Sequence, residues 1–297
     1  MKMSSVSDRT IAPVNYFVVF YSCHGRVLMP IASLNAARLF YEERGSGPPI
    51  LFIHGTGADS DIWSGSVGAL GADYRCIAYD RRGYGRSPLP AGESISLEAN
   101  DAAALLKLLG AVPAMIVGHS LGGVIALDLA VEHPQLVAGL LLVEPPLRAR
   151  LQRRPDLSAV RAMIAIHVLR LVGSRRASAE RFLRWAYGSD PAEGGYRNIP
   201  GVARAAGESY DTIIHELGLG TGEHLTPERL GSIAVPVNFL LGELTAAGMR
   251  RLVIDAVGMI PGAVLHMVPD ASHGLHVTRP DMFIDAVRSM SGWSGER

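Results

Sequence analysis

The stretch around Ser120 contains residues arranged for nucleophilic catalysis. A short apolar run, Ala114–Val117, has the length and composition of a buried strand, and a helical pattern follows that ends before Pro134. Between them the chain turns through Gly118-His119-Ser120-Leu121-Gly122, so strand, G-x-S-x-G and helix occur in the order of a nucleophile elbow. Glycines two residues before and after the serine remove side chains that would clash in so tight a turn. The pattern predicts that Ser120 is a nucleophile at the start of a helix.

A serine hydroxyl is a weak nucleophile unless a base takes its proton, so other parts of the chain must supply a histidine and a carboxylate. His273 follows the predicted strand Val264–Val268 by five residues and stands in the required order, after the nucleophile. We therefore predict His273 as the base, with His276 as the second candidate. His119 lies beside the nucleophile, and we interpret it as a packing or hydrogen-bonding residue.

The elements that must position these residues alternate between strands and helices. Continuous apolar runs are typical of strands buried on both faces, as in a parallel sheet. The alternation therefore predicts an α/β fold with a mostly parallel central sheet flanked by helices. The predicted strands are Ile31–Leu34, Arg38–Glu42, Ile50–Ile53, Arg75–Tyr79, Ala114–Val117, Val137–Val143, Val237–Leu241 and Val264–Val268. The predicted helices of this layer include Ser96–Leu109, with Ser96 as its cap, then Met249–Met259 and a last helix from Pro280.

The alternation stops after the sixth predicted strand. Residues 147–225 carry only helical patterns, at Ser158–Val172, Ser178–Tyr187 and Val202–Leu217. We predict that this block is a helical cap inserted into the sheet domain. The core would then consist of residues 29–146 and 226–297.

Length and composition exclude several classes of protein. The chain has 297 residues, enough for one elaborated domain or two small ones. It is 48% hydrophobic and balances Lys+Arg 28 against Asp+Glu 28, which argues against nucleic acid or an anionic membrane as main partner. Two cysteines, Cys23 and Cys76, are too few for a disulfide framework or a zinc site. No apolar run approaches the roughly 18 residues of a membrane span, and we expect a cytoplasmic protein.

The N-terminal residues 1–28 are set apart from the predicted core. Lys2 precedes an apolar patch, Tyr16–Cys23, that loosely resembles a secretion signal but lacks a convincing cleavage site. Alternatively, Met29 is the natural start, because a complete domain pattern opens there. We favour a poorly ordered or dispensable extension over a signal peptide.

Four segments in this order resemble the α/β-hydrolase fold family, over a range from Ile31 to about Ser289: His54-Gly55, the Asp80–Ser87 loop, Gly118–Gly122 and Ala271-Ser272-His273. The resemblance implies a serine hydrolase that needs no cofactor or metal. It also implies an oxyanion hole made of the N–H groups of Leu121, just after the nucleophile, and of Thr56, after His54-Gly55. The loop from Asp80 is then structural, and Asp80 is scaffold.

The sequence departs from the family pattern at the triad acid. After the strand Val237–Leu241 the family usually has Gly-x-x-Asp, and here Thr245 stands at the aspartate position. Glu144, which ends the preceding strand, and Glu243, offset by two residues, are the candidate replacements. We prefer Glu144, because its strand delivers it to the edge of the sheet that carries the nucleophile and because glutamate has the longer reach. Asp270, or no acid at all, is the remaining alternative.

Two features of the cap bear on the substrate. Met163, Ile164 and Leu171 recur near helical spacing, and we predict that some of these residues line an apolar acyl pocket while core packing explains the others. The stretch from Arg148 to Arg184 holds ten arginines and only two acids. A solvated helix face explains such a charge run, and attraction of anionic substrates is the sharper alternative.

These patterns predict a serine hydrolase that cleaves a carboxylic ester, lactone or thioester, with a mainly apolar acyl compound as its small-molecule substrate. The serine argues against epoxide hydrolases and haloalkane dehalogenases, which the family builds on an aspartate at this position. A carbon–carbon bond hydrolase or a cofactor-free perhydrolase would use the same triad and stays open. From a different class, the rival is a ligand-binding receptor that kept the fold without turnover. The natural substrate and the oligomeric state are left open.

Overall fold

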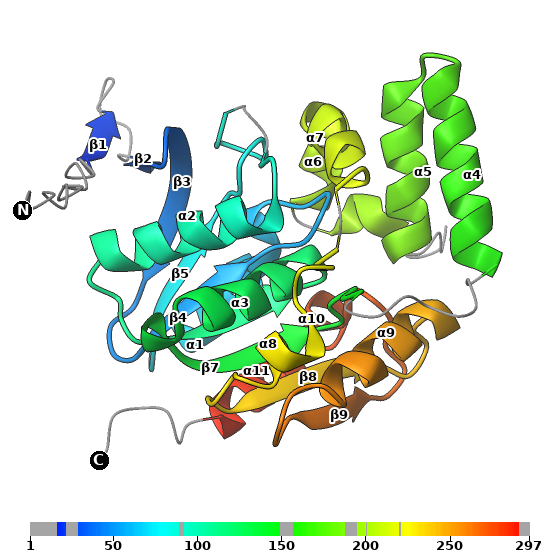
Figure 1. The fold of residues 1–297 in the computed structure, drawn as a ribbon. Helices are drawn as coiled ribbons and strands as arrows, with labels where there is room; N and C mark the ends of the chain where they lie inside the picture. The colour runs from blue at the N-terminus through cyan, green and yellow to red at the C-terminus, as the bar shows by residue number, and fades with distance from the viewer. Residues whose placement is uncertain are drawn as a thin grey trace, which may run out of the picture.

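The computed structural model describes residues 17–21, 29–88, 92–148, 157–187, 195–199, 201–219 and 221–290. Within these residues nine strands form one sheet, in the order β1-β2-β3-β5-β4-β6-β7-β8-β9 (Figure 1). Pairs among β1, β2, β3 and β5 are antiparallel and the remaining pairs are parallel, which confirms the predicted mostly parallel sheet. The strands are β1 (Phe17–Tyr21), β2 (Met29–Leu34), β3 (Ala37–Arg44), β4 (Pro49–Ile53), β5 (Arg75–Tyr79), β6 (Ala114–His119), β7 (Val137–Val143), β8 (Val237–Gly242) and β9 (Val264–Val268).

Helices cover both faces of the sheet, which is why its central strands are apolar throughout. In β4, Leu51 and Ile53 pack into one buried cluster, while Ile50 and Phe52 pack into another on the opposite face. The first cluster lies under α2 (Ile95–Leu108), α3 (Leu121–Glu132), α8 (Pro227–Leu230) and α9 (Ala247–Val257). The second lies under α1 (Ser64–Leu70), α10 (Leu275–Thr278) and α11 (Pro280–Ser289).

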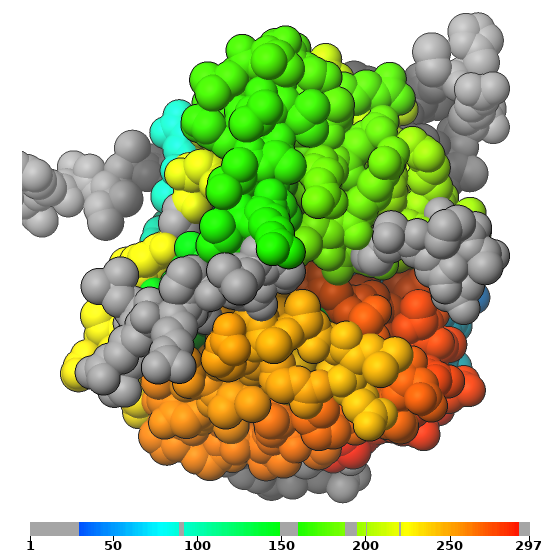
Figure 2. Space-filling view, turned by 90° about the vertical axis from the view of Figure 1, so that its right-hand side faces the viewer, coloured from blue at the N-terminus to red at the C-terminus, as the bar shows by residue number. Residues whose placement is uncertain are grey.

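A helical insertion follows β7, which is the sixth strand counted from Met29, as the sequence predicts. Its described helices are α4 (Leu157–Leu171), α5 (Arg175–Tyr187), α6 (Val202–Glu208) and α7 (Tyr210–Glu216). We call this group of helices the cap. Figure 1 shows α4 as its outermost element. In Figure 2 the green cap residues lie above the orange and red C-terminal segments of the core.

Two local predictions need correction. The helix predicted at Val202–Leu217 is interrupted at Ser209, whose N–H closes α6 on the carbonyl of Ala205 at 2.9 Å and whose ψ of 22° leaves the helical region. The N-cap residue of α2 is Ser94 and not Ser96. Ser94 has the extended backbone that a helix cap needs, and its hydroxyl accepts from the N–H of Leu97 at 3.1 Å.

The N-terminal segment contributes one described strand to the sheet. β1 pairs antiparallel with β2, from Phe17 opposite Ser33 to Tyr21 opposite Met29. The rest of the predicted extension, residues 1–16 and 22–28, lies outside the described residues. In the described part of the chain, no helix has the length and apolar character required to cross a membrane.

Candidate active site

Ser120 occupies a strained turn between β6 and α3. Its φ of 51° and ψ of −122° lie where non-glycine residues are rare, which is typical of functional sites. The flanking glycines make this turn possible. A Cβ on Gly118 would lie 2.5 Å from the carbonyl oxygen of Gly122, and a Cβ on Gly122 would lie 2.2 Å from that of Ile53. The G-x-S-x-G spacing is therefore required by close contacts between main-chain atoms.

His273 and Glu144 come together at the carboxyl edge of the sheet. The Nδ1 of His273 lies 2.8 Å from Oε2 of Glu144, whose side chain is fully buried. The other oxygen, Oε1, accepts from the N–H of Gly242 at 2.8 Å and from the hydroxyl of Thr245. Three donors thus fix the carboxylate, and the carboxylate in turn fixes the imidazole with Nδ1–H toward it, so that Nε2 is the ring nitrogen turned away from Glu144.

Of the two glutamates that the sequence left as alternatives, only Glu144 contacts His273 among the contacts of the described residues. Glu243 is exposed, and its Oε2 accepts from the N–H of Asp270 at 3.3 Å. Asp270 is itself paired with Arg279 at 3.3 Å. Thr245, which stands where the family has its aspartate, donates a hydrogen bond to the glutamate of the neighbouring strand.

The two segments that carry the groups predicted for the oxyanion hole lie next to Ser120. A Cβ on Gly55 would lie 2.8 Å from the Cβ of Ser120, so the main chain before Thr56 passes directly beside the serine. Leu121 is the first residue of α3, and N–H groups of the first helical turn have no acceptor within the helix. The main chain of two segments therefore flanks the serine, and the oxyanion-hole roles of Thr56 and Leu121 stay a prediction.

Buried side chains hold the loop His54–Gly57, which we call the oxyanion loop. The N–H of Arg81 donates to Nε2 of His54 at 2.9 Å, which leaves Nδ1–H to donate to the carbonyl of Gly55 at 2.8 Å. Burial and the charge of Arg81 lower the pKa of His54 to about 3, so this imidazole is neutral. The hydroxyl of Tyr84 accepts from the N–H of Gly57 at 3.2 Å.

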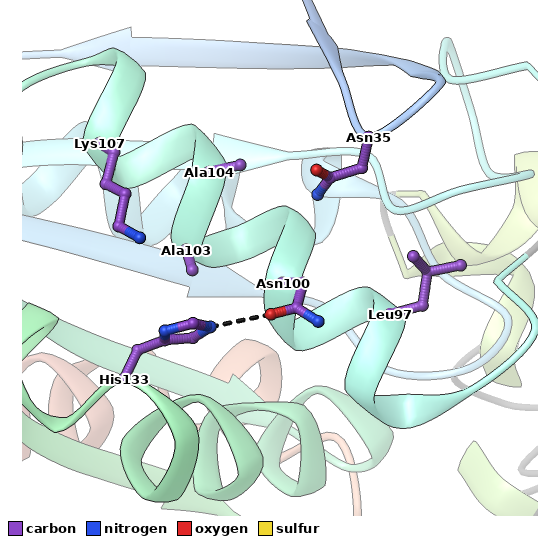
Figure 3. Close-up of a pocket in the computed structure, with 7 residues that line it drawn as sticks. All are labelled: Asn35, Leu97, Asn100, Ala103, Ala104, Lys107 and His133. Carbon is purple, nitrogen blue, oxygen red and sulfur yellow. Dashed lines mark hydrogen bonds between the residues drawn. The ribbon is translucent and has the colours of Figure 1, made fainter. Parts of the chain in front are cut away.

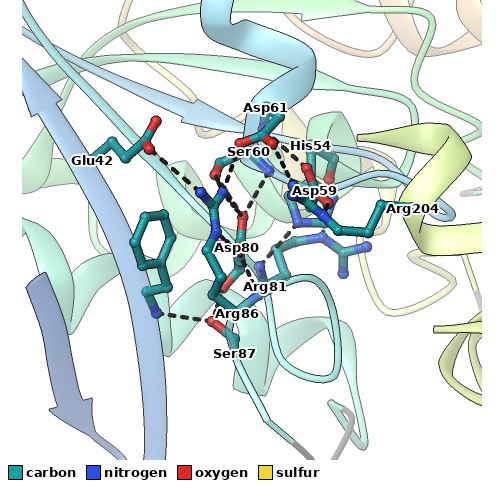
Figure 4. A network of polar contacts seen from close by, with 11 residues as sticks. Glu42, His54, Asp59, Ser60, Asp61, Asp80, Arg81, Arg86, Ser87 and Arg204 are labelled. Atoms are coloured by element: carbon teal, nitrogen blue, oxygen red, sulfur yellow. Dashed lines mark hydrogen bonds and ion pairs between the residues drawn. The ribbon is translucent and has the colours of Figure 1, made fainter. Parts of the chain in front are cut away.

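A second polar network anchors the residues just after this loop (Figure 4). Asp80 accepts from the N–H of Ser60 at 2.8 Å and from Nε of Arg86 at 2.8 Å. Although burial raises the pKa of Asp80, the contacts with Arg86 lower it overall. Asp59 pairs with Arg204 of α6 at 2.6 Å, so the network reaches into the cap.

The other two histidines near the site are buried and neutral. The Nε2–H of His119 donates to the carbonyl of His273 at 2.9 Å, and burial, then His276 and His273, hold the pKa of His119 well below its usual range. His276 packs between the rings of His119 and Trp63, at 4.3 and 4.6 Å between centroids. Burial and the neighbouring His273 lower the pKa of His276 to about 3.

Cap residues other than those predicted lie over the site. A Cβ on Gly57 would lie 2.4 Å from Leu183 and 3.5 Å from Ile213, so both side chains rest on the oxyanion loop. The ring of Tyr187 lies 5.8 Å from that of His273, between centroids. The sequence prediction missed Leu183, although Ala179, Phe182 and Leu183 form a buried stripe at helical spacing.

The three residues predicted to line the acyl pocket lie on the outer helix of the cap. Met163, Ile164 and Leu171 are 36%, 59% and 74% exposed on α4. The side of α4 that packs inward carries Ala162 and Ile166 instead. The role of the three residues in substrate binding stays a prediction.

Two further features of the described residues bear on ligands. No three His, Cys, Asp or Glu side chains gather there in the way a metal site requires. An open groove of about 280 Å³ lies along α2 (Figure 3), and its lining comes from that helix, the β2–β3 turn and the residue after α3. None of its residues contributes to the site around Ser120. They are Asn35, Leu97, Asn100, Ala103, Ala104, Lys107 and His133.

Comparison with known proteins places the chain among hydrolases. "Putative carbamate hydrolase RutD" of Variovorax paradoxus is 30% identical over 263 residues, or 82% of this chain and 92% of that protein. A pimeloyl-(acyl-carrier protein) methyl ester esterase of Aeromonas hydrophila is 29% identical over 264 residues, or 84% and 98%. Some matches are shorter: one of 122 residues, 38% identical, spans 46% of the relative's length.

A solved structure and a family model also match this chain. The structure of "Est816 as an N-Acyl homoserine lactone degrading enzyme" superimposes with a TM-score of 0.70 at 25% identity, over 88% of this chain and 99% of that one. A model of the "Alpha/beta hydrolase family" matches residues 50–286. This range contains the oxyanion loop, the elbow at Ser120 and the loop that carries His273. The chain is therefore a hydrolase with esterase-like relatives, and it belongs to the alpha/beta hydrolase family.

Proposed function

We propose that this hydrolase cleaves carboxylic esters, lactones or thioesters through an acyl-enzyme formed on Ser120. The observation that carries the proposal is the hydrogen bond from His273 to the buried carboxylate of Glu144, 2.8 Å long, beside a strained serine elbow. A serine with an oriented histidine and flanking main-chain donors is the arrangement that acyl transfer requires.

In this mechanism, the Ser120 hydroxyl attacks the substrate carbonyl while Nε2 of His273 takes its proton. Glu144 accepts from Nδ1–H throughout, and its charge stabilises the imidazolium that forms. The N–H groups of Leu121 and Thr56 stabilise the oxyanion. His273 then gives the proton to the leaving alcohol or thiol, and water repeats the cycle to release the acid.

The substrate proposal rests on what covers the site. Leu183 and Ile213 rest on the oxyanion loop, and both are apolar and fully buried, which suits a small apolar acyl group. A methyl ester esterase and a lactone-degrading enzyme among the similar proteins point in the same direction. A carbon–carbon bond hydrolase and a perhydrolase would use the same residues, and no contact of the described residues favours either.

The test is active-site labelling combined with a substrate panel. A fluorophosphonate probe should label the wild type, and Ser120→Ala should lose both labelling and at least ~10³-fold in kcat. The panel holds p-nitrophenyl esters of increasing chain length, acyl lactones, a thioester and a carbamate. Labelling of the alanine variant at the wild-type level would exclude Ser120 as the nucleophile. Stabilisation by a panel compound without turnover would favour the receptor.

A further inference from the structure

The oxyanion loop is held by two side chains that in turn depend on one residue of the cap. Arg81 donates from Nε to the carbonyl of His54 at 3.0 Å, and the Tyr84 hydroxyl accepts from the N–H of Gly57. Both side chains then bind the carboxylate of Glu216, at the C-terminal end of α7. The contacts therefore run from the cap to both ends of the loop.

The hydrogen bonds and ion pairs of Glu216 are short and almost completely buried. Its Oε1 accepts from Arg81 at 2.8 Å, and its Oε2 accepts from the Tyr84 hydroxyl at 2.8 Å and from Arg81 at 3.3 Å. The side chain of Arg81 is 0% exposed and that of Glu216 is 2% exposed. One turn earlier on α7, the Thr212 hydroxyl donates to the carbonyl of Gly83 at 3.0 Å. Thr212 and Glu216 lie on the same face of α7, and both form hydrogen bonds with the loop that carries Arg81 and Tyr84.

The stability of the core does not by itself explain why a second carboxylate, that of Glu216, is buried beside Arg81. Glu98 of α2 already binds Arg81, at 3.1 Å, so one buried guanidinium carries two buried carboxylates. Burial raises the pKa of Glu98 to about 7 against the opposing effect of Arg81, with Glu216 and Asp101 adding to the rise. A second buried carboxylate adds a desolvation cost that an isolated ion pair would not carry. What Glu216 supplies, and Glu98 does not, is the contact with Tyr84.

We propose that Glu216 is a positioning residue for the oxyanion loop: by holding Arg81 and Tyr84 it keeps the main chain of His54 to Gly57 in the conformation that binds the oxyanion. This inference rests on the proposed function. It couples the docking of α7 to transition-state stabilisation, because the loop loses its support when the cap helix leaves. Glu216 itself does not touch the substrate.

The test compares three variants. Glu216→Gln removes the charge and presents an amide to Arg81 or to Tyr84, and Tyr84→Phe deletes only the hydroxyl and keeps the ion pairs. Glu98→Gln is the matched control, because it alters the other carboxylate on Arg81 without touching Tyr84. We expect kcat for p-nitrophenyl acetate to fall about 10- to 100-fold in the first two variants, since a misplaced oxyanion donor acts on the transition state. KM should change less than threefold in all three.

Hydrogen exchange of the Gly57 amide supplies a readout that does not need turnover. It should accelerate in Glu216→Gln, because the carboxylate of Glu216 holds the tyrosine that binds this amide, and stay unchanged in Glu98→Gln. Unchanged exchange and unchanged kcat in a folded Glu216→Gln would overturn the inference. So would equal kcat losses in Glu216→Gln and Glu98→Gln, which would indicate a general loss of packing.

Because loss of Glu216 leaves part of a buried guanidinium unpaired, that variant is destabilised, and Tyr84→Phe decides if it does not fold. Wild-type kcat in Tyr84→Phe would then overturn the inference. If the wild type turns over no ester, the proposed function fails, and the exchange of the Gly57 amide alone decides the coupling between cap and loop.

Discussion

The edge of the sheet and the cap place their side chains by different means. At the edge, Ser120, Glu144 and His273 each follow a strand, and hydrogen bonds fix Glu144 and His273 in defined orientations. In the cap, Leu183 of α5 is placed by apolar packing. In the proposed mechanism, the reacting atoms then depend on the core, while the shape of the acyl site depends on the apolar side chains of the cap. Variants at the edge should therefore affect turnover, and variants of the apolar side chains of the cap should affect selectivity, whereas the polar contact of Glu216 acts on turnover through the oxyanion loop.

The largest expected effect separates the two glutamates that follow β7 and β8. Glu144→Gln removes the charge that stabilises the imidazolium of His273, and kcat should fall by about 10⁴-fold, the precedent for an acid-to-amide change in a triad. Glu243→Gln alters an exposed side chain and should change kcat less than threefold. Steady-state kinetics on a p-nitrophenyl ester, with unfolding curves for both variants, measure the difference.

A larger loss of kcat in Glu243→Gln than in Glu144→Gln, in variants of equal stability, would place the triad acid after β8. It would also contradict the assignment of Glu144 to the edge that carries Ser120 and His273. Equal and small losses would mean that His273 works without a carboxylate. In that case the contact of Glu144 with His273 would serve the fold only.

The second effect is on stability in acid, and it also concerns the edge of the sheet. The pKa of His276 is lowered to about 3 in the folded protein, so its imidazole stays neutral there at pH 5 to 7. In the unfolded chain the same imidazole takes up a proton near pH ~6.5. The resulting stability is present above ~6.5 and is lost as the pH falls toward 3. Between pH 7 and pH 5 this histidine accounts for a loss of about 2 kcal/mol.

His276→Phe should remove that part of the acid sensitivity, because phenylalanine fills the site against Trp63 without a proton to bind. Free energies of unfolding in urea at pH 7, 6 and 5 compare it with the wild type. The variant should lose about 2 kcal/mol less over this range. Parallel curves for the two proteins would show that the imidazole is protonated equally in both states.

A third, smaller effect concerns Thr245, which stands at the family's usual acid position. Thr245→Val keeps the shape and deletes one of the hydrogen bonds that hold Glu144, while the N–H of Gly242 remains. We expect kcat to fall about tenfold, in line with the net worth of a hydrogen bond to a charged group. Full activity would mean that the main-chain donor suffices to hold the acid.

Much of the edge was predictable from the sequence, because parallel strands deliver their following residues to one side. Ser120 in its elbow and His273 after a late strand follow from order alone. The preference for Glu144 over Glu243 rests on strand position and reach, because order alone does not separate two glutamates that both follow strands. Their separation depends on the direction of two side chains, and Glu243 turns outward to the N–H of Asp270.

The cap was less predictable, for a reason visible in α4. This helix is apolar on two faces: Ala162 and Ile166 are buried, while Ile164 and Leu171 are exposed. Helical periodicity therefore could not tell which face meets the core. The contact of Glu216 with Arg81 joins residues 135 positions apart in the sequence, and no local sequence pattern predicts such a pair.

The smallest expected effect tests the cap directly, with two leucines that differ in position. Leu183 of α5 is fully buried against the oxyanion loop, and Leu171 of α4 is 74% exposed. Leu183→Ala should change the kcat/KM ratio of butanoyl to acetyl p-nitrophenyl ester by about fourfold, the worth of one methylene contact at ~0.8 kcal/mol. Leu171→Ala is the matched control, and its ratio should move less than twofold. An equal shift for Leu171→Ala would mean that the substrate reaches α4, as the sequence predicted. The acyl site would then extend beyond the buried side of the cap, and α4 would have to move toward the core during turnover.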